Sequence, residues 1–103
     1  MATMKEYGLA IYNRSDVENH YTVKASSIDN LRARILKEYR KKIPEGGMIK
    51  VVVFDKDGNM KYLGDVTRAV NGCNWYAYHK SKNGSIMVSK IMPNGSLKLV
   101  RRL

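Results

Sequence analysis

An aromatic run, Trp75-Tyr76-Ala77-Tyr78-His79-Lys80, combines the two side-chain types that hold single-stranded nucleic acid. Aromatic rings stack on bases, and lysine ammonium groups contact phosphates. Side chains alternate between the two faces of a β-strand, so in a strand Tyr76, Tyr78 and Lys80 would share one face. Trp75 would then lie on the opposite face, and we place it in the core.

More cations follow in the last predicted strand, over residues 97–102. Alternation would put Lys98, Val100 and Arg102 on one side of it. Together with the tyrosines, these cations predict a basic surface that binds nucleic acid through stacking and phosphate contacts. The alternative is purely structural, because aromatic residues favour strands and stabilise cross-strand pairs.

A third set of cations would line the outside of a helix. Arg34, Lys37 and Lys41 recur at helical spacing, roughly opposite Ile35. Such a row can bind consecutive backbone phosphates and release their counterions. The alternative is a solvated face whose cations lie near the helix C-terminus, where the macrodipole favours them.

Charge is the strongest feature of the composition. The chain has 19 Lys and Arg against 9 Asp and Glu, a formal net charge of +10. No carboxylate follows Asp65, although Lys and Arg continue to the end of the sequence. A field of one sign attracts polyanions and raises their encounter rate, so it indicates the kind of partner and not the fold.

Catalytic and metal-binding patterns are missing from the sequence. His20, Cys73 and His79 are scattered, and there is no HExxH, CxxC or paired-histidine spacing. Gly46-Gly47 follows the predicted helix, whereas a phosphate-binding loop precedes one. Residues 55–58, which resemble the start of a calcium loop, fit a hairpin turn better. We therefore expect no catalytic residue, no metal and no cofactor, and so no enzyme.

The elements that would position these residues are marked by turns. Asn-Gly or Asp-Gly pairs favour tight hairpins, and the chain has four, at 57–58, 71–72, 83–84 and 94–95. Their spacing predicts an antiparallel meander of strands near 49–55, 60–68, 74–81, 86–92 and 97–102. Alternation predicts two earlier strands, over 6–13 and 20–25, joined by a loop over 13–19.

One helix is predicted, over about 27–43. Ser26 and Asp29 have capping-box spacing. Ile28, Leu31 and Ile35 then recur on one face, and Pro44 ends the segment. Arg32 falls within this apolar arc, where we expect it to serve packing. The order of elements predicts an α+β fold: a single two-layer domain over 1–103, with ββα followed by a five-stranded antiparallel meander and the helix packed on the sheet.

Cys73 is the only cysteine, and no apolar run approaches the length that spans a bilayer. We therefore expect a cytoplasmic protein without membrane contact. The oligomeric state, and the choice between an open sheet and a small barrel, stay open.

Two functions of different classes fit these features. The first is a non-enzymatic module that contacts nucleic acid or a ribonucleoprotein, chiefly through backbone phosphates. The second is a protein-binding inhibitor or adaptor whose target is an acidic protein or a ribonucleoprotein. Small, charged, cofactor-free proteins of phages and mobile elements that inhibit host nucleases, anti-CRISPR proteins among them, provide an analogy of class for it.

Overall fold

The computed structural model describes residues 4–14, 16–77 and 87–102, with residues 77, 101 and 102 described by their backbone alone. Seven strands lie within these residues, namely β1 (Lys5–Asn13), β2 (Asp16–Ala25), β3 (Met48–Phe54), β4 (Met60–Arg68), β5 (Cys73–Ala77), β6 (Met87–Ile91) and β7 (Leu97–Arg102). One helical segment joins β2 to β3. It consists of α1 (Ile28–Arg34), a π-helical turn (Ile35–Tyr39) and a 3₁₀ turn (Arg40–Lys42).

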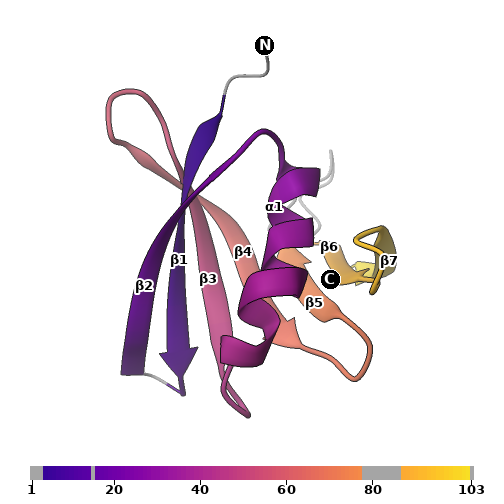
Figure 1. Cartoon of the computed structure of the whole chain (residues 1–103). Helices are drawn as coiled ribbons and strands as arrows, with labels where there is room; N and C mark the ends of the chain where they lie inside the picture. Colours follow the sequence, from indigo (N-terminus) through magenta and orange to yellow (C-terminus); the bar gives the residue numbers. More distant parts are fainter. Residues whose placement is uncertain (1–3, 15, 78–86, 103) are drawn as a thin grey trace.

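The strands form a single sheet in the order β2-β1-β3-β4-β5-β6-β7, antiparallel at every pairing. The helical segment covers one face of this sheet (Figure 1). The predicted two-layer α+β fold is therefore confirmed. Among the described strands the sheet is open, with β2 and β7 as its outer strands.

The core lies between the helical segment and the sheet. Leu31 and Ile35 on the helical side meet Leu9, Ile49 and Val51 on the strands, and all five are almost fully buried. Each such side chain contributes roughly 1.5–3 kcal/mol by leaving water. Hydrophobic burial on one sheet face thus fixes which face of every strand turns away from the helix.

Trp75 is part of this core, as predicted. Its ring is 4% exposed, and its indole Nε1 donates a hydrogen bond to the Leu63 carbonyl at 3.1 Å. The neighbouring Tyr76 is 36% exposed, so side chains at these two positions of β5 alternate between the faces.

The helix starts one residue later than the capping-box spacing predicted. Ser27 is the N-cap, and its hydroxyl accepts a hydrogen bond from the Asn30 backbone N–H at 3.1 Å. The Asn30 side chain accepts in return from the Ser26 N–H at 3.4 Å. Asp29 forms an ion pair with Arg32 instead. Ser26 and Ser27 are both suitable N-cap residues. With Ser27 as the N-cap, the side chains of Ser27 and Asn30 each accept a hydrogen bond from a backbone N–H group.

Arg32 lies in the apolar arc, as its position predicted. Its side chain is 13% exposed, and its Nε atom is buried without a hydrogen-bond partner among the described residues. Burial lowers the pKa of this guanidinium below its ordinary value. The aliphatic part of the Arg32 side chain packs against the core, and its guanidinium Nη2 contacts Asp29.

The helical segment ends with a change of winding that the sequence pattern did not predict. After Arg34 the turn widens to the π form, and after Tyr39 it tightens to the 3₁₀ form. A π-helical turn contains more residues than an α-helical turn. The rotation of about 100° per residue, which was used to assign residues to a face of the helix, therefore does not hold for residues after this turn.

The predicted loop over 13–19 is wrong, because β2 already begins at Asp16. Residues 16–20 are all exposed, and they pair with β1 through a bulge between Ile11 and Tyr12. An outer strand beyond the edge of the helix layer needs no apolar face, so its sequence lacks the alternation that marks buried strands.

Among the described residues, no helix is long and apolar enough to cross a bilayer.

Candidate nucleic-acid interface

The three predicted helix cations differ in their partners. The Arg34 Nε donates to Glu38 Oε2 at 3.0 Å, and its Nη1 donates to the Lys24 carbonyl at 2.7 Å. Arg34 therefore ties the helix to β2, and its charge is shared with a carboxylate. Lys37 and Lys41 are exposed and form no ion pair with a described residue.

Arg40 has a structural role that sequence spacing did not reveal. Its Nε donates to the Gly72 carbonyl at 3.0 Å, and its Nη2 donates to the carbonyls of Ala69 and Val70 at 2.7 and 3.1 Å. The planar fork of arginine suits several acceptors at once. Arg40 thus fastens the β4–β5 turn to the end of the helical segment.

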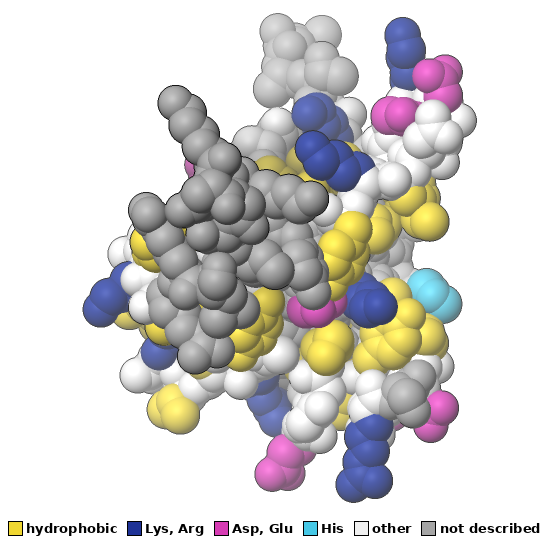
Figure 2. Space-filling model, turned by 180° about the vertical axis from the view of Figure 1, so that it is seen from behind, with side chains coloured by type: hydrophobic (Ala, Val, Ile, Leu, Met, Phe, Trp, Pro, Cys, Tyr) yellow, Lys and Arg dark blue, Asp and Glu magenta, His cyan; other side chains and the backbone are white. Residues whose placement is uncertain are grey.

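The face of the sheet that turns away from the helix, called the open face below, is not covered by any described helix or strand (Figure 2). The strand register gives its central row. Ala10 of β1 pairs with Lys50 of β3, Lys50 pairs with Asp65 of β4, and Asp65 pairs with Tyr76 of β5. Residues directly opposite one another share a face, so four neighbouring strands contribute to one band.

A compact group of side chains lies on this band, and we call it the tyrosine–lysine cluster: Tyr12, Lys50, Tyr62 and Asp65. The Lys50 Nζ lies 5.3 Å from the centre of the Tyr12 ring and 6.0 Å from the centre of the Tyr62 ring. The Tyr62 hydroxyl donates a hydrogen bond to Asp65 Oδ1. An ammonium group at this distance is attracted by the ring faces, which holds all three side chains in position.

Tyr62 and Tyr76 both expose more than a third of their surface, at 38% and 36%. Tyr62 lies three residues before Asp65 on β4, and Tyr76 lies directly beside Asp65 on β5. The open face therefore presents two exposed rings next to Asp65. Exposed aromatic rings of this kind can stack on other flat ring systems.

Two more lysines extend the open face toward the outer strand. Lys90 of β6 pairs directly with Lys98 of β7, and Lys90 also pairs with Asn74 of β5. Like charges directly opposite each other destabilise a sheet. An anion bound at this pair would relieve the repulsion between the two lysines.

The remaining predicted residues have different outcomes. Tyr78 and Lys80 lie outside the described residues, and of Arg102 only the backbone is described. Arg102 pairs with Met87, whereas Lys98 pairs with Lys90. An extra residue of β7 lies between them, where the register shifts at Val88 and Ser89. The strict alternation assumed from Lys98 to Arg102 is therefore wrong.

Sequence reasoning missed Tyr12, Lys50 and Tyr62. Alternation along residues 49–55 would have turned Lys50 away from the core, because Ile49 and Val51 flank it. No such signal brings it to Tyr12 and Tyr62, since the three residues come from different strands. Only the pairing of β1, β3 and β4 places them together.

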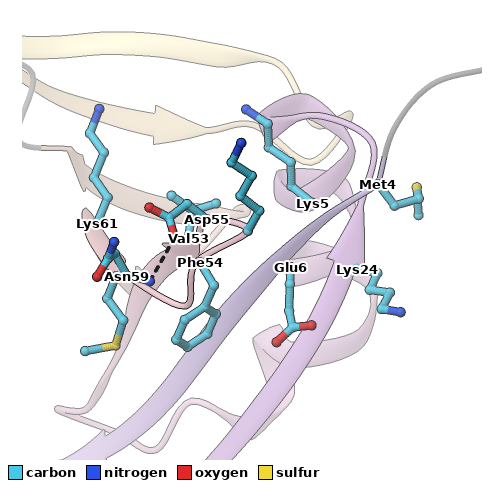
Figure 3. Close-up of a pocket in the computed structure, with 11 residues that line it drawn as sticks. Met4, Lys5, Glu6, Lys24, Val53, Phe54, Asp55, Asn59 and Lys61 are labelled. Atoms are coloured by element: carbon cyan, nitrogen blue, oxygen red, sulfur yellow. Dashed lines mark hydrogen bonds between the residues drawn. The ribbon is translucent and has the colours of Figure 1, made fainter.

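An open hollow lies where β1 begins and the β3–β4 hairpin turns (Figure 3). Its lining includes four lysines, Lys5, Lys24, Lys56 and Lys61. Lys5 and Lys61 extend to one side of the strands in Figure 3, whereas Glu6 and Phe54 extend to the other. The charged and apolar groups therefore do not converge on one enclosed point, as binding of a small molecule requires.

The metal-ligating and nucleophilic side chains of the described residues are separated from one another. No group of three or more His, Cys, Asp or Glu among them is placed to hold a metal ion. Cys73 is fully buried in the core, and this burial raises the pKa of its thiol. A buried neutral thiol is a poor nucleophile.

The comparisons with known proteins add no assignment. No protein family, no curated protein and no solved structure matches the chain. The side chains of the open face are therefore the basis on which a function can be proposed.

Proposed function

We propose that this protein is a non-enzymatic module that binds single-stranded nucleic acid, alone or within a ribonucleoprotein, on the open face of its sheet. The observation that carries the proposal is the tyrosine–lysine cluster, in which Lys50 is held between the rings of Tyr12 and Tyr62. The cluster lies beside exposed Tyr76 on a face that no described element covers.

Each part of the open face has a role in this proposal. Tyr62 and Tyr76 stack on bases, which any base permits because every base has a π face. Lys50, Lys90 and Lys98 contact backbone phosphates, which position the strand without reading its sequence. Asp65 accepts the hydrogen bond of the Tyr62 hydroxyl and so fixes the orientation of that ring.

The proposal favours single strands over duplexes. A flat sheet face with rings can stack only on bases that are not already stacked inside a double helix. Among the described residues, the helical segment exposes Lys37, Lys41 and Lys42, but it lacks the exposed tyrosine rings of the open face. A cytoplasmic setting belongs to the same proposal, because the lone Cys73 is buried and needs no oxidising compartment.

The decisive experiment titrates labelled single-stranded and duplex oligonucleotides, of RNA and of DNA, by fluorescence anisotropy at 50 and 200 mM salt. We expect single strands to bind more tightly than duplexes. With about four phosphate contacts, the affinity should fall roughly 50-fold between these salt concentrations. Absence of binding to every oligonucleotide at 50 mM salt would refute the proposal and leave the protein-directed alternative.

A matched pair of variants locates the binding surface. Lys50→Gln and Lys41→Gln each remove one positive charge, but the first lies on the open face and the second on the helix. Lys50→Gln should weaken single-strand binding clearly more than Lys41→Gln. Tyr76→Leu, which keeps apolar bulk but removes the ring, should cost about 1–3 kcal/mol of binding free energy.

Equal losses for Lys50→Gln and Lys41→Gln would show that only the net charge matters, and would contradict a site on the open face. Thermal unfolding of each variant controls for stability, since a variant that melts at the wild-type temperature loses affinity through contacts alone.

A further inference from the structure

The two outer strands of the sheet differ in what they expose. The exposed start of β2, residues 16–20, is polar apart from Val17 and includes Asp16 and Glu18. β7 exposes three large apolar side chains, with Leu97 at 44%, Leu99 at 43% and Val100 at 56%. Exposed apolar side chains on an outer strand favour pairing with another chain, whereas like charges on the two strands oppose it.

The outer edge of β7 is available for pairing among the described strands. β6 pairs with one side of β7, and no described strand pairs with the other. β7 spans six residues, Leu97–Arg102. This is a typical strand length, and an edge of this kind can accept an extended segment as an additional strand.

We propose that β7 is the docking edge for an extended acidic segment of another protein, which adds to the sheet next to β7. The proposal rests on charge complementarity, because Lys98, Arg101 and Arg102 lie within β7 and the chain has no carboxylate after Asp65. It does not depend on nucleic-acid binding by the open face.

A second copy of β7 brings only cations and no carboxylate to this edge. An antiparallel pairing of two β7 strands, centred between Leu99 and Val100, sets Lys98 of each copy opposite Arg101 of the other. Like charges directly opposite one another destabilise a strand pair. An acidic segment turns the same positions into attractive pairs.

The register also sets the pattern of the partner. Leu97 and Leu99 pair with Ile91 and Ser89, both of which are buried on the helix side of the sheet. Lys98 lies between them, on the open face opposite Lys90. A segment that matches β7 therefore alternates apolar residues, opposite the two leucines, with an acidic residue opposite Lys98.

A synthetic peptide tests this directly. The probe is a capped peptide of about eight residues in which Glu and Val alternate, titrated into the full-length ¹⁵N-labelled protein and followed by NMR. The controls are a peptide of alternating Lys and Val, and the Glu–Val peptide N-methylated at alternate residues, which removes the backbone donors along one edge.

We expect saturable binding of the Glu–Val peptide, with the largest chemical-shift changes at the backbone amides of β7. The Lys–Val peptide should bind roughly tenfold more weakly. The N-methylated Glu–Val peptide should not bind. Lys98→Glu should narrow or reverse the preference between the two charged peptides. The matched control Lys37→Glu, on the helix, should leave the preference unchanged.

Three outcomes overturn the proposal. The first is no saturable binding of the Glu–Val peptide, and the second is equal affinity for both charged peptides. The third is a set of shifts centred on β2 or on the open face. Sedimentation of the protein alone gives a further check, because concentration-dependent dimerisation that Leu99→Lys abolishes would assign the edge to a second copy instead.

Discussion

Arg40 shows how a single side chain can connect two parts of the fold. Three backbone carbonyls of the β4–β5 turn accept hydrogen bonds from its guanidinium, although they lie 29 to 32 positions later in the sequence. In the sequence Arg40 is one of several cations in the stretch Arg40-Lys41-Lys42. Nothing in that run distinguishes a structural arginine from its solvated neighbours.

Arg40→Ala should lower the free energy of unfolding by about 2 kcal/mol, because hydrogen bonds to a charged group contribute roughly 1.5–3 kcal/mol. Arg40→Lys should recover only part of this loss, since an ammonium group cannot reproduce the planar fork. Urea unfolding measures both. The control is exposed Lys41→Ala, expected within about 0.5 kcal/mol of wild type, and an Arg40→Ala value equally small would contradict the structural role.

Asp55 gives a prediction that depends on pH. Its carboxylate accepts hydrogen bonds from the backbone N–H groups of Asp57 and Asn59, both at 2.9 Å, within the β3–β4 turn. Hydrogen bonding, chiefly from the Asn59 backbone, lowers the pKa of this carboxyl below its ordinary value. The stabilisation is therefore complete above the unfolded pKa of about 3.9, and it is lost as the pH falls through the lower folded pKa.

Asp55→Asn keeps an oxygen acceptor for the turn but does not titrate. The stability difference between wild type and this variant should accordingly shrink as the pH is lowered below about 4. An NMR titration of the Asp55 carboxyl provides the direct measurement. A pKa at or above the ordinary value would show that the turn does not depend on the ionised form.

At the scale of elements, the turns were the most predictable part of the chain. The Asp57-Gly58, Asn71-Gly72 and Asn94-Gly95 pairs all place glycine at positive φ, at 82°, 91° and 88°. The strands between them therefore appear close to their predicted bounds, and β4 matches its range of 60–68 fully. The Asn83-Gly84 pair lies outside the described residues.

Two of these glycines make a matched pair for mutation. A Cβ atom at Gly72 would lie 2.1 Å from the Ile91 carbonyl oxygen, whereas at Gly58 nothing lies within 4 Å. Gly58→Ala should therefore cost only the strain of positive φ, about 1–2 kcal/mol. Gly72→Ala should cost roughly 3 kcal/mol or more, because the backbone of β6 must also shift. Similar urea midpoints for the two variants would contradict the close approach.

The candidate site was predicted less well than the strands. Tyr76 of β5 and Lys98 of β7 were each found from the alternation of side chains along its own strand. The strand pairing places both residues on the open face. Tyr12, Lys50 and Tyr62 required the pairing of three strands, including a register shift between Val51 and Val52. Alternation reports the face of each residue, but the sequence has no comparable signal for the register that brings strands together.

At the scale of the whole molecule, the described Lys and Arg side chains do not gather into one surface, although the net charge is +10. Figure 2 shows Lys and Arg side chains at several separate places over the open face, with hydrophobic and acidic side chains between them. Lys37 and Lys41 lie on the helix, on the other side of the sheet (Figure 1). One short strand of nucleic acid cannot contact both sides, so the mutations that separate the two sides decide where binding occurs.

The place of β1 in the sheet has a consequence for how the chain folds during synthesis. β1 precedes β3 by a long stretch of chain, and its ladder with β3 joins residues 36 to 48 positions apart. The other ladders join strands that follow each other directly in the chain. Closing this long loop is costly in chain entropy, and such non-local pairing sets the pace of folding. The strands that complete the core on the apolar side of the helix therefore become available only after residue 54 has been synthesised.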